Sequence, residues 1–109
     1  MSGSGSFGDM GNLLKQAQQM HAEMNRAREE LRSLVVSGTS GGGAVRIDAN
    51  GEGMIVRVSI RPDALQGGDA ALIEDLVLVA ARDAITKANE KNRERMARVT
   101  GGLNLPGLF

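Results

Sequence analysis

The sequence predicts an α+β protein in which a long N-terminal helix and a long C-terminal helix flank a small three-stranded antiparallel sheet. Two stretches of helically spaced apolar residues predict the helices, and an Asn50-Gly51 turn between two alternating apolar segments predicts the sheet. The chain has 109 residues, a length that suits one domain. Its only aromatic residues are Phe7 and Phe109, so the core must consist of aliphatic residues, methionine and alanine.

The first predicted helix runs from a cap at Asp9 to about Leu34. Its apolar residues recur at intervals of four and three, which is a heptad seam, namely Leu13, Ala17, Met20, Met24, Ala27, Leu31 and Leu34. Such a seam commonly packs against another helix, although its methionines would also suit an adaptable partner surface. Residues 1–8 are rich in Ser and Gly, and we expect them to form a flexible segment.

Three short strands are predicted between the helices. The first covers residues 35–39, and a Ser-Gly-Gly-Gly connector leads from it into the hairpin. With Asn50 and Gly51 as the central turn residues, Val45 would face Val56 and Ile47 would face Met54. Val58 continues the same alternation, and Pro62 ends the strand because proline cannot donate to the ladder.

A second long helix is predicted from Asp69 to about Val99, after one helical turn at residues 62–65. Apolar residues dominate its first half, and polar residues surround it beyond Asn89. Acidic residues come early and basic residues late, the order that the helix dipole favours. Residues 9–99 are therefore predicted to form the single domain, followed by a Gly/Leu/Pro tail at residues 100–109.

Composition argues against an enzyme. The chain has no cysteine, which excludes disulfides and thiolate metal sites, and its one histidine, His21, has no nucleophile partner or co-ligand. We therefore predict no catalytic residue, no metal, no cofactor and no small-molecule substrate. No apolar stretch reaches the roughly 18 residues of a membrane span, so we expect a soluble protein without a membrane partner. The lack of cysteine is compatible with a reducing, cytoplasmic setting.

Basic residues form a stripe near the end of the second helix. Lys87, Lys91, Arg95 and Arg98 are spaced by four, four and three residues, so they share one helix face. Phosphate binding requires such a stripe, although the 13 basic and 13 acidic residues of the whole chain cancel. The alternative is a solvated face with pairing within the helix, since Asp83 precedes Lys87 by four residues and Glu94 precedes Arg98 by four.

The apolar patterns also predict a homodimer. A small sheet with two apolar faces, together with a heptad seam, leaves more apolar surface than a monomer of this size can bury. The residues that we expect in the helix seam or the dimer contact are Leu13, Met20, Met24, Leu31, Val45, Ile47, Val56 and Val58.

Distinctive motifs stand near both ends of the chain. Residues 7–20 read FGDMGNLLKQAQQM, and residues 100–107 read TGGLNLPG. Between them lie the Asn50-Gly51 hairpin, the VSIRP segment at residues 58–62 and the apolar segment at residues 76–84. Together these segments resemble the YbaB/EbfC family of bacterial nucleoid-associated DNA-binding proteins.

The resemblance implies an α+β homodimer whose sheets join and whose long helices project as two jaws. It implies binding of double-stranded DNA with low sequence specificity, a place in the bacterial cytoplasm and nucleoid, and a link to recombination or replication proteins. By the resemblance, DNA contacts would come from the two long helices, at Lys15 and at the stripe of Lys87, Lys91, Arg95 and Arg98. If the stripe is only a solvated face, the further candidates lie on the first helix around Lys15, Arg26 and Arg28. The alternative is a protein-interaction adaptor in recombinational repair for which DNA contact is incidental.

Overall fold

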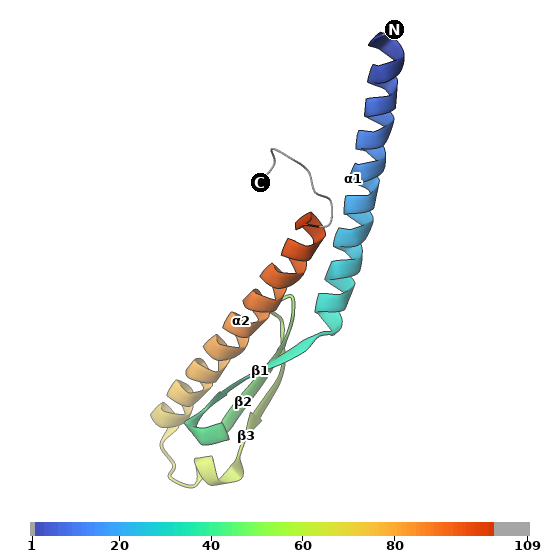
Figure 1. The fold of residues 1–109 in the computed structure, drawn as a ribbon. Helices are drawn as coiled ribbons and strands as arrows, with labels where there is room; N and C mark the ends of the chain where they lie inside the picture. Colours follow the sequence, from blue (N-terminus) through green and yellow to red (C-terminus); the bar gives the residue numbers. More distant parts are fainter. Residues whose placement is uncertain (1, 102–109) are drawn as a thin grey trace.

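The chain folds as helix, three-stranded sheet and helix (Figure 1). The computed structural model describes residues 2–101, with side chains from Gly8 onward. The helices are α1 (Ser2–Ser33) and α2 (Ala70–Gly101), and the strands are β1 (Val35–Ser40), β2 (Val45–Asn50) and β3 (Ile55–Ile60). Two 3₁₀ turns, η1 (Gly41–Gly43) and η2 (Pro62–Leu65), connect them. The sheet is antiparallel with the order β1-β2-β3, so the predicted fold class and order of elements are confirmed.

The molecule is elongated. Its principal extents are 81 × 22 × 16 Å and its radius of gyration is 21.8 Å, whereas a compact domain of this length has about 13 Å. The N-terminal half of α1 projects away from the sheet and beyond the end of α2 (Figure 1). The projecting part therefore lacks neighbours within its own chain among the described residues.

The ends of the helices differ from the prediction in two places. α1 begins at Ser2, so Asp9 lies inside the helix and is not its cap. α2 does begin at the predicted cap, because Asp69 Oδ1 accepts a hydrogen bond from the backbone N–H of Leu72 at 3.2 Å. α2 continues through Gly101, so only residues 102–109 of the predicted tail follow it, and they lie outside the described residues.

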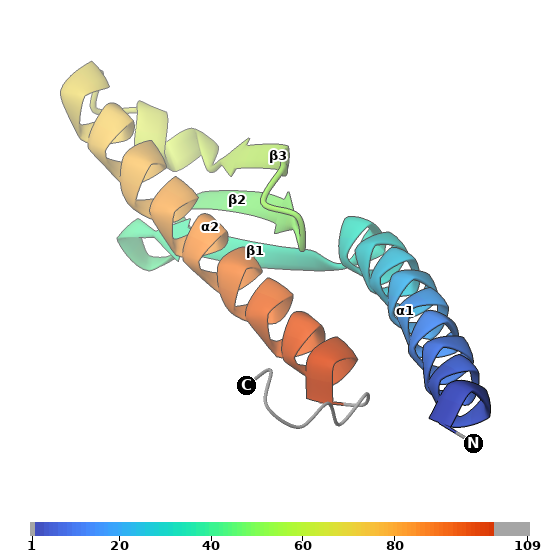
Figure 2. The ribbon, with the colours of Figure 1, turned by 90° about the horizontal axis from the view of Figure 1, so that it is seen from above.

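The core lies between α2 and the first two strands. α2 crosses one face of the sheet over β1 and β2 (Figure 2). Its buried alanines, Ala80, Ala84 and Ala88, pack against Val45, Ile47 and Ala49 of β2. Small residues on the helix let its backbone approach the sheet closely, and Gly38 of β1 lies directly under Ala80 and Ala84. The core is therefore thin and aliphatic, as the lack of aromatic residues predicted.

The hairpin has a different register from the predicted one. Val45 pairs with Ile60 and Ile47 pairs with Val58, so the predicted pairs Val45–Val56 and Ile47–Met54 are wrong. The backbone N–H of Asn50 donates to the carbonyl of Met54 at 2.8 Å, which closes a loop longer than two residues. Gly53 in that loop has φ +89°, a left-handed value that suits glycine. The alternation of apolar residues could not reveal the error, because a shift by an even number of residues leaves every side chain on its face.

The strand β3 is poorly covered. Val45 and Ile47 of β2 are buried as predicted, but Val58 is 52% exposed and Val56 is 53% exposed. Val56 also has no opposite partner, because the register shifts between Asp48–Arg57 and Ala49–Ile55. Ile60 is half-buried and packs against the core, whereas the other apolar side chains of β3 are exposed.

The two edges of the sheet differ in whether side chains bind their outward-facing backbone groups. On β1, the backbone N–H of Thr39 donates to Asp83 Oδ2 at 3.1 Å, and the carbonyl of Ser37 accepts from Lys87 Nζ at 3.0 Å. The pKa of Asp83 is lowered, most of all by the hydrogen bond from the Thr39 N–H and then by the one from Lys87. On β3, no side chain of the described residues caps the outer edge. The open edge of this sheet is thus that of β3.

The heptad seam of α1 is covered along only part of its length. Ala27 and Leu31 are buried, Met20 and Met24 are half-buried, and Leu13 is 61% exposed. The backbone N–H of Gly51 donates to the carbonyl oxygens of Leu31 (2.7 Å) and Leu34 (3.1 Å), which fixes the hairpin loop against the end of α1. The C-terminal part of the heptad seam is therefore covered within the chain, and Leu13 lies on the projecting part.

Candidate nucleic-acid interface

The predicted basic stripe does not form one free cationic surface. Lys87 binds Asp83 Oδ2 at 3.1 Å as well as the carbonyl of Ser37, so it holds α2 on the edge of β1. Lys91 lies 3.8 Å from Glu94. The pairing of Asp83 with Lys87 follows the predicted spacing of four, whereas Glu94 pairs with Lys91 and forms no ion pair with Arg98.

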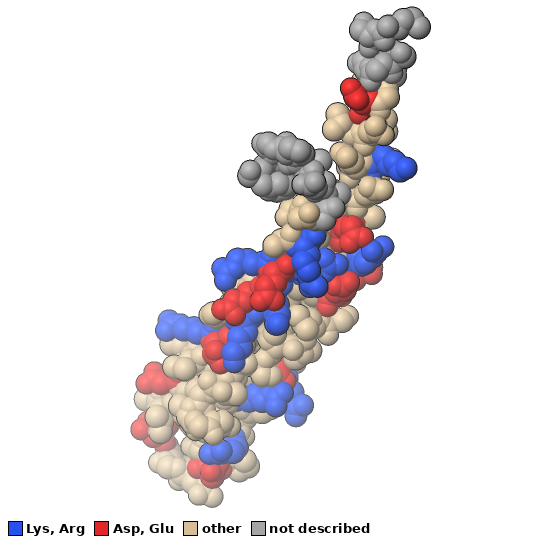
Figure 3. Space-filling view, viewed as in Figure 1, with Lys and Arg blue, Asp and Glu red and all other residues tan. Residues whose placement is uncertain are grey.

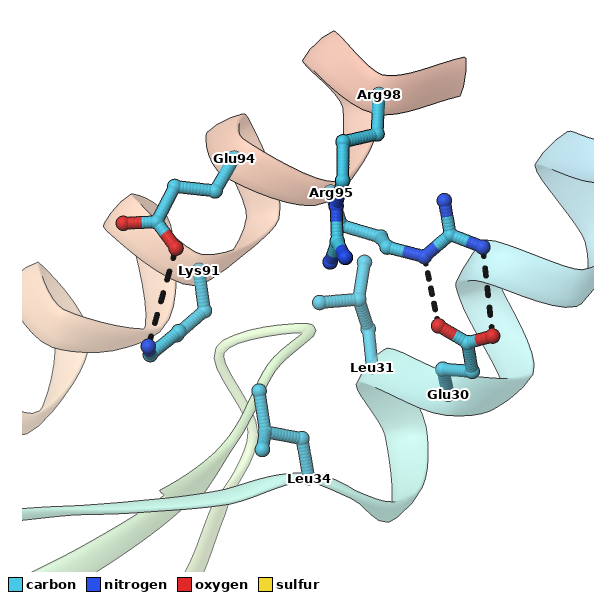
Figure 4. A pocket seen from close by; sticks show the side chains of 7 residues that line it. All are labelled: Glu30, Leu31, Leu34, Lys91, Glu94, Arg95 and Arg98. Atoms are coloured by element: carbon cyan, nitrogen blue, oxygen red, sulfur yellow. Dashed lines mark hydrogen bonds and ion pairs between the residues drawn. The ribbon is translucent and has the colours of Figure 1, made fainter. Parts of the chain in front are cut away.

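Arg95 connects the two helices. Its Nε donates to Glu30 Oε2 at 2.6 Å, and its Nη2 donates to Glu30 Oε1 at 3.3 Å (Figure 4). Its Nη2 also lies 4.0 Å from a carboxylate oxygen of Glu23. The Arg95 side chain is only 11% exposed, so it is held between the two helices and does not project freely, and its role in DNA contact stays a prediction. The reason for its low exposure is the antiparallel packing of α1 on α2, which brings Glu23 and Glu30 to its side.

A cavity of about 240 Å³ lies beside this ion pair. It is lined by Glu30, Leu31, Leu34, Lys91, Glu94, Arg95 and Arg98 (Figure 4). Arg98 extends from the last turns of α2 along the cavity, and no carboxylate of the described residues pairs with it. The hydrogen bond from Arg95 lowers the pKa of Glu30, and the same bond raises the pKa of Arg95. Both side chains therefore stay charged at neutral pH.

The Glu30–Arg95 pair should make stability depend on pH. Because its folded-state pKa is lowered, Glu30 stabilises the fold above its ordinary pKa, and this contribution disappears as the pH falls through the lowered value. We expect Glu30→Gln to lower the melting temperature at pH 7 and to have progressively less effect below about pH 4. Thermal unfolding followed by circular dichroism at a series of pH values measures this difference.

Glu29→Gln provides the matched control, because the neighbouring Glu29 has no ion pair among the described residues. Its melting temperature should follow that of the parent protein at every pH. A Glu30→Gln difference that stays constant from pH 7 to about pH 3 would contradict the assignment.

The candidates on α1 lie on different faces of the helix. Lys15 is exposed on the projecting half, about 200° around the helix from Leu13. Arg26 pairs with Glu23 within α1, whereas Arg28 is exposed without an ion pair among the described residues. The structure thus separates the candidates into three exposed unpaired side chains, Lys15, Arg28 and Arg98, and four engaged ones, Arg26, Lys87, Lys91 and Arg95.

Three further basic side chains are exposed and have no ion pair within residues 8–101, namely Arg57, Arg82 and Arg93. None of the three is among the predicted DNA-contact residues. Arg82 and Arg93 lie on the face of α2 that points away from the sheet, and both are outside the periodic stripe that suggested a site. Helical periodicity relative to the buried Ala80 and Ala84 would have indicated their exposure.

Charged side chains of both signs gather where α1 meets α2 (Figure 3). The projecting half of α1 carries few charges in this view, with Lys15 as its one basic residue. Within the part of the chain that has described side chains, no three His, Asp or Glu residues come together as metal ligands. None of the helices searched is both long enough and apolar enough to cross a bilayer.

These features define an elongated α+β protein with basic side chains on two long helices and an open strand edge. Residues 7–103 match the YbaB/EbfC DNA-binding family, and the chain belongs to that family. The family membership confirms the resemblance and identifies the chain as a member of a non-enzymatic DNA-binding family.

Relatives with similar sequences have names that agree with this family. A nucleoid-associated protein of Caldanaerobacter subterraneus is 45% identical over 101 residues, which cover 93% of this chain and 91% of that one. A nucleoid-associated protein of Pelotomaculum thermopropionicum is 42% identical over 102 residues, covering 94% and 97%. The crystal structure of an uncharacterized protein from Helicobacter pylori superposes with a TM-score of 0.69 at 27% identity, covering 88% of this chain and 97% of that one.

Proposed function

We propose that this protein is a homodimeric nucleoid-associated protein that binds double-stranded DNA with low sequence specificity. The proposal rests on where certain exposed basic side chains lie. These are the six that form no ion pair within the described part of the chain. Five of these six lie on the two long helices, namely Lys15, Arg28, Arg82, Arg93 and Arg98. Side chains on projecting helices can reach a duplex without interference from the sheet.

Low sequence specificity follows from the kinds of side chain available. Lysine and arginine on exposed helix faces bind phosphate oxygens, and such contacts position a protein without reading bases. Residues 8–101, whose side chains the structure describes, include no aromatic residue that would stack on unpaired bases. The zero formal net charge implies a modest affinity that depends on local charge.

The open edge of β3 supports the dimer. Its outer backbone groups are uncapped within the described residues, and its exposed apolar side chains are Ile55, Val56 and Val58. Unpaired strand edges with apolar side chains readily pair with another strand. A second copy of β3 would cover both the edge and the apolar side chains, and the twofold symmetry would present each basic helix surface twice.

A salt series of DNA binding tests the proposed contacts. We expect the triple variant Lys15→Ser, Arg93→Ser, Arg98→Ser to bind duplex DNA about tenfold or more weakly than the parent at about 0.1 M salt. The decrease in affinity should be similar for all sequences, and the slope of log affinity against log salt should fall by about one for each phosphate that the variant no longer neutralises. Fluorescence anisotropy with labelled duplexes measures both quantities.

The control triple variant removes the same charge from three arginines that are also exposed but form ion pairs. Arg32, Arg46 and Arg61 are 65%, 58% and 53% exposed and bind Glu52, Asp48 and Asp63. Their replacement by serine should affect affinity much less. Equal decreases in affinity for both triples would refute the assignment to the unpaired basic side chains of the helices, and a parent protein that binds no DNA even at low salt would favour the adaptor alternative.

A further inference from the structure

The projecting half of α1 has an apolar seam that the described chain leaves uncovered. Ala27 and Leu31 are 0% and 2% exposed under α2, whereas Leu13 and Met10 are 61% and 64% exposed farther along the same helix. Leu13 and Leu31 lie on the same helix face, since 18 residues make five turns. The exposed apolar residues are therefore a direct continuation of the α1–α2 contact.

α2 ends beside the point where this seam becomes exposed. Arg95 of α2 pairs with Glu30 and lies 4.0 Å from Glu23. The helices are antiparallel, so the later turns of α2 lie closer to the N-terminus of α1 (Figure 1). Val99 on those turns is 3% exposed. The chain then leaves the described residues after Gly101, six residues beyond Arg95 and thus on the side of Glu23 toward the N-terminus of α1.

The sequence that follows has the composition and length to cover the seam. Residues 102–109 read GLNLPGLF, in which every residue is apolar or glycine except Asn104. Eight residues in an extended conformation reach about 26 Å, whereas Met20 and Met10 lie about 15 Å apart along a helix. Pro106 opposes a continuation of α2 through this segment.

We propose that residues 102–109 fold back along α1 and cover the seam formed by Met10, Leu13 and Ala17 of the same chain. The tail is tethered beside the seam, so its effective concentration there is on the order of millimolar, far above that of a second molecule at micromolar concentration. Lys15 lies on the opposite side of α1 from Leu13, so the docked tail leaves it free. The proposal does not depend on DNA binding.

Disulfide trapping tests the docking directly, because the chain has no native cysteine. The full-length double variant Leu13→Cys, Leu105→Cys should form an intramolecular disulfide in a glutathione redox buffer. The control pair Lys15→Cys, Leu105→Cys places the first thiol on the opposite face and should form the bond at least tenfold more slowly. Equal rates, or a disulfide that joins two chains, would overturn the proposal.

Hydrogen exchange provides a second measurement without cysteines. Replacing the apolar tail residues Leu103, Leu105, Leu108 and Phe109 with serine should accelerate amide exchange at residues 10–20 by about tenfold. Amides of β2 report on the core and should exchange as in the parent protein. Unchanged protection at residues 10–20 would show that the tail does not cover α1.

Discussion

Gly38→Ala is expected to lower the free energy of unfolding by about 3 kcal/mol or more, which corresponds to a fall in melting temperature of roughly 10 °C or more. A Cβ atom at Gly38 would collide with the carbonyl oxygen of Ala80 and the backbone nitrogen of Ala84, and it would lie 2.9 Å from Ala84 Cα. These are backbone atoms of α2, so no side-chain rotation can relieve the collision. The helix must move away from the sheet and loosen the thin core.

Gly67→Ala is the matched control for this variant. No atom lies within 4 Å of a Cβ built at Gly67, so the same substitution there should change stability by much less. Urea unfolding followed by circular dichroism measures both variants. A Gly38→Ala protein as stable as Gly67→Ala would show that α2 does not approach β1 as closely as described.

Val58→Asp is expected to convert the proposed dimer into a folded monomer. In the single chain Val58 is 52% exposed, so a carboxylate at this position remains hydrated and the monomer should keep its fold. In a dimer joined through β3, the same carboxylate would be buried without a partner, at a cost of several kcal/mol. Light scattering coupled to size exclusion at micromolar concentration should show half the mass of the parent protein.

Val79→Asp separates this effect from a general effect of added charge. Val79 of α2 is also 52% exposed, but it lies on a helix and away from β3. Its variant should keep the parent mass. A monomeric parent protein, or dissociation of the dimer in both variants, would count against pairing through β3.

The order and type of the elements could be predicted because local patterns determine them. The heptad spacing in α1, the alternation in β2 and β3, and the cap at Asp69 each involve residues close in sequence. The exposure of β3 could not be predicted in this way. β2 and β3 alternate equally well, and only the position of α2 in space decides that β2 is covered and β3 is not.

The ion pairs of the candidate DNA-contact residues could likewise be predicted only where both partners are close in sequence. The pair Asp83–Lys87 follows from spacing along one helix, and it forms as predicted. The partner of Arg95 is Glu30, which is 65 residues away in sequence and comes close only when α1 packs against α2. The roles of Lys15, Arg28 and Arg98 in DNA contact remain predictions, since their exposure permits a phosphate contact without requiring it.

The hydrogen bonds from α2 to β1 limit how far the sheet can grow. Asp83 and Lys87 occupy outward-facing backbone groups of Thr39 and Ser37, so a further strand cannot align along β1 without displacing them. A sheet with one blocked edge accepts a neighbour on one side only, and two such sheets that join leave no free edge for a third. In the proposed dimer, these two side chains of α2 would limit the assembly to two copies and protect an aliphatic protein from ribbon-like polymerisation.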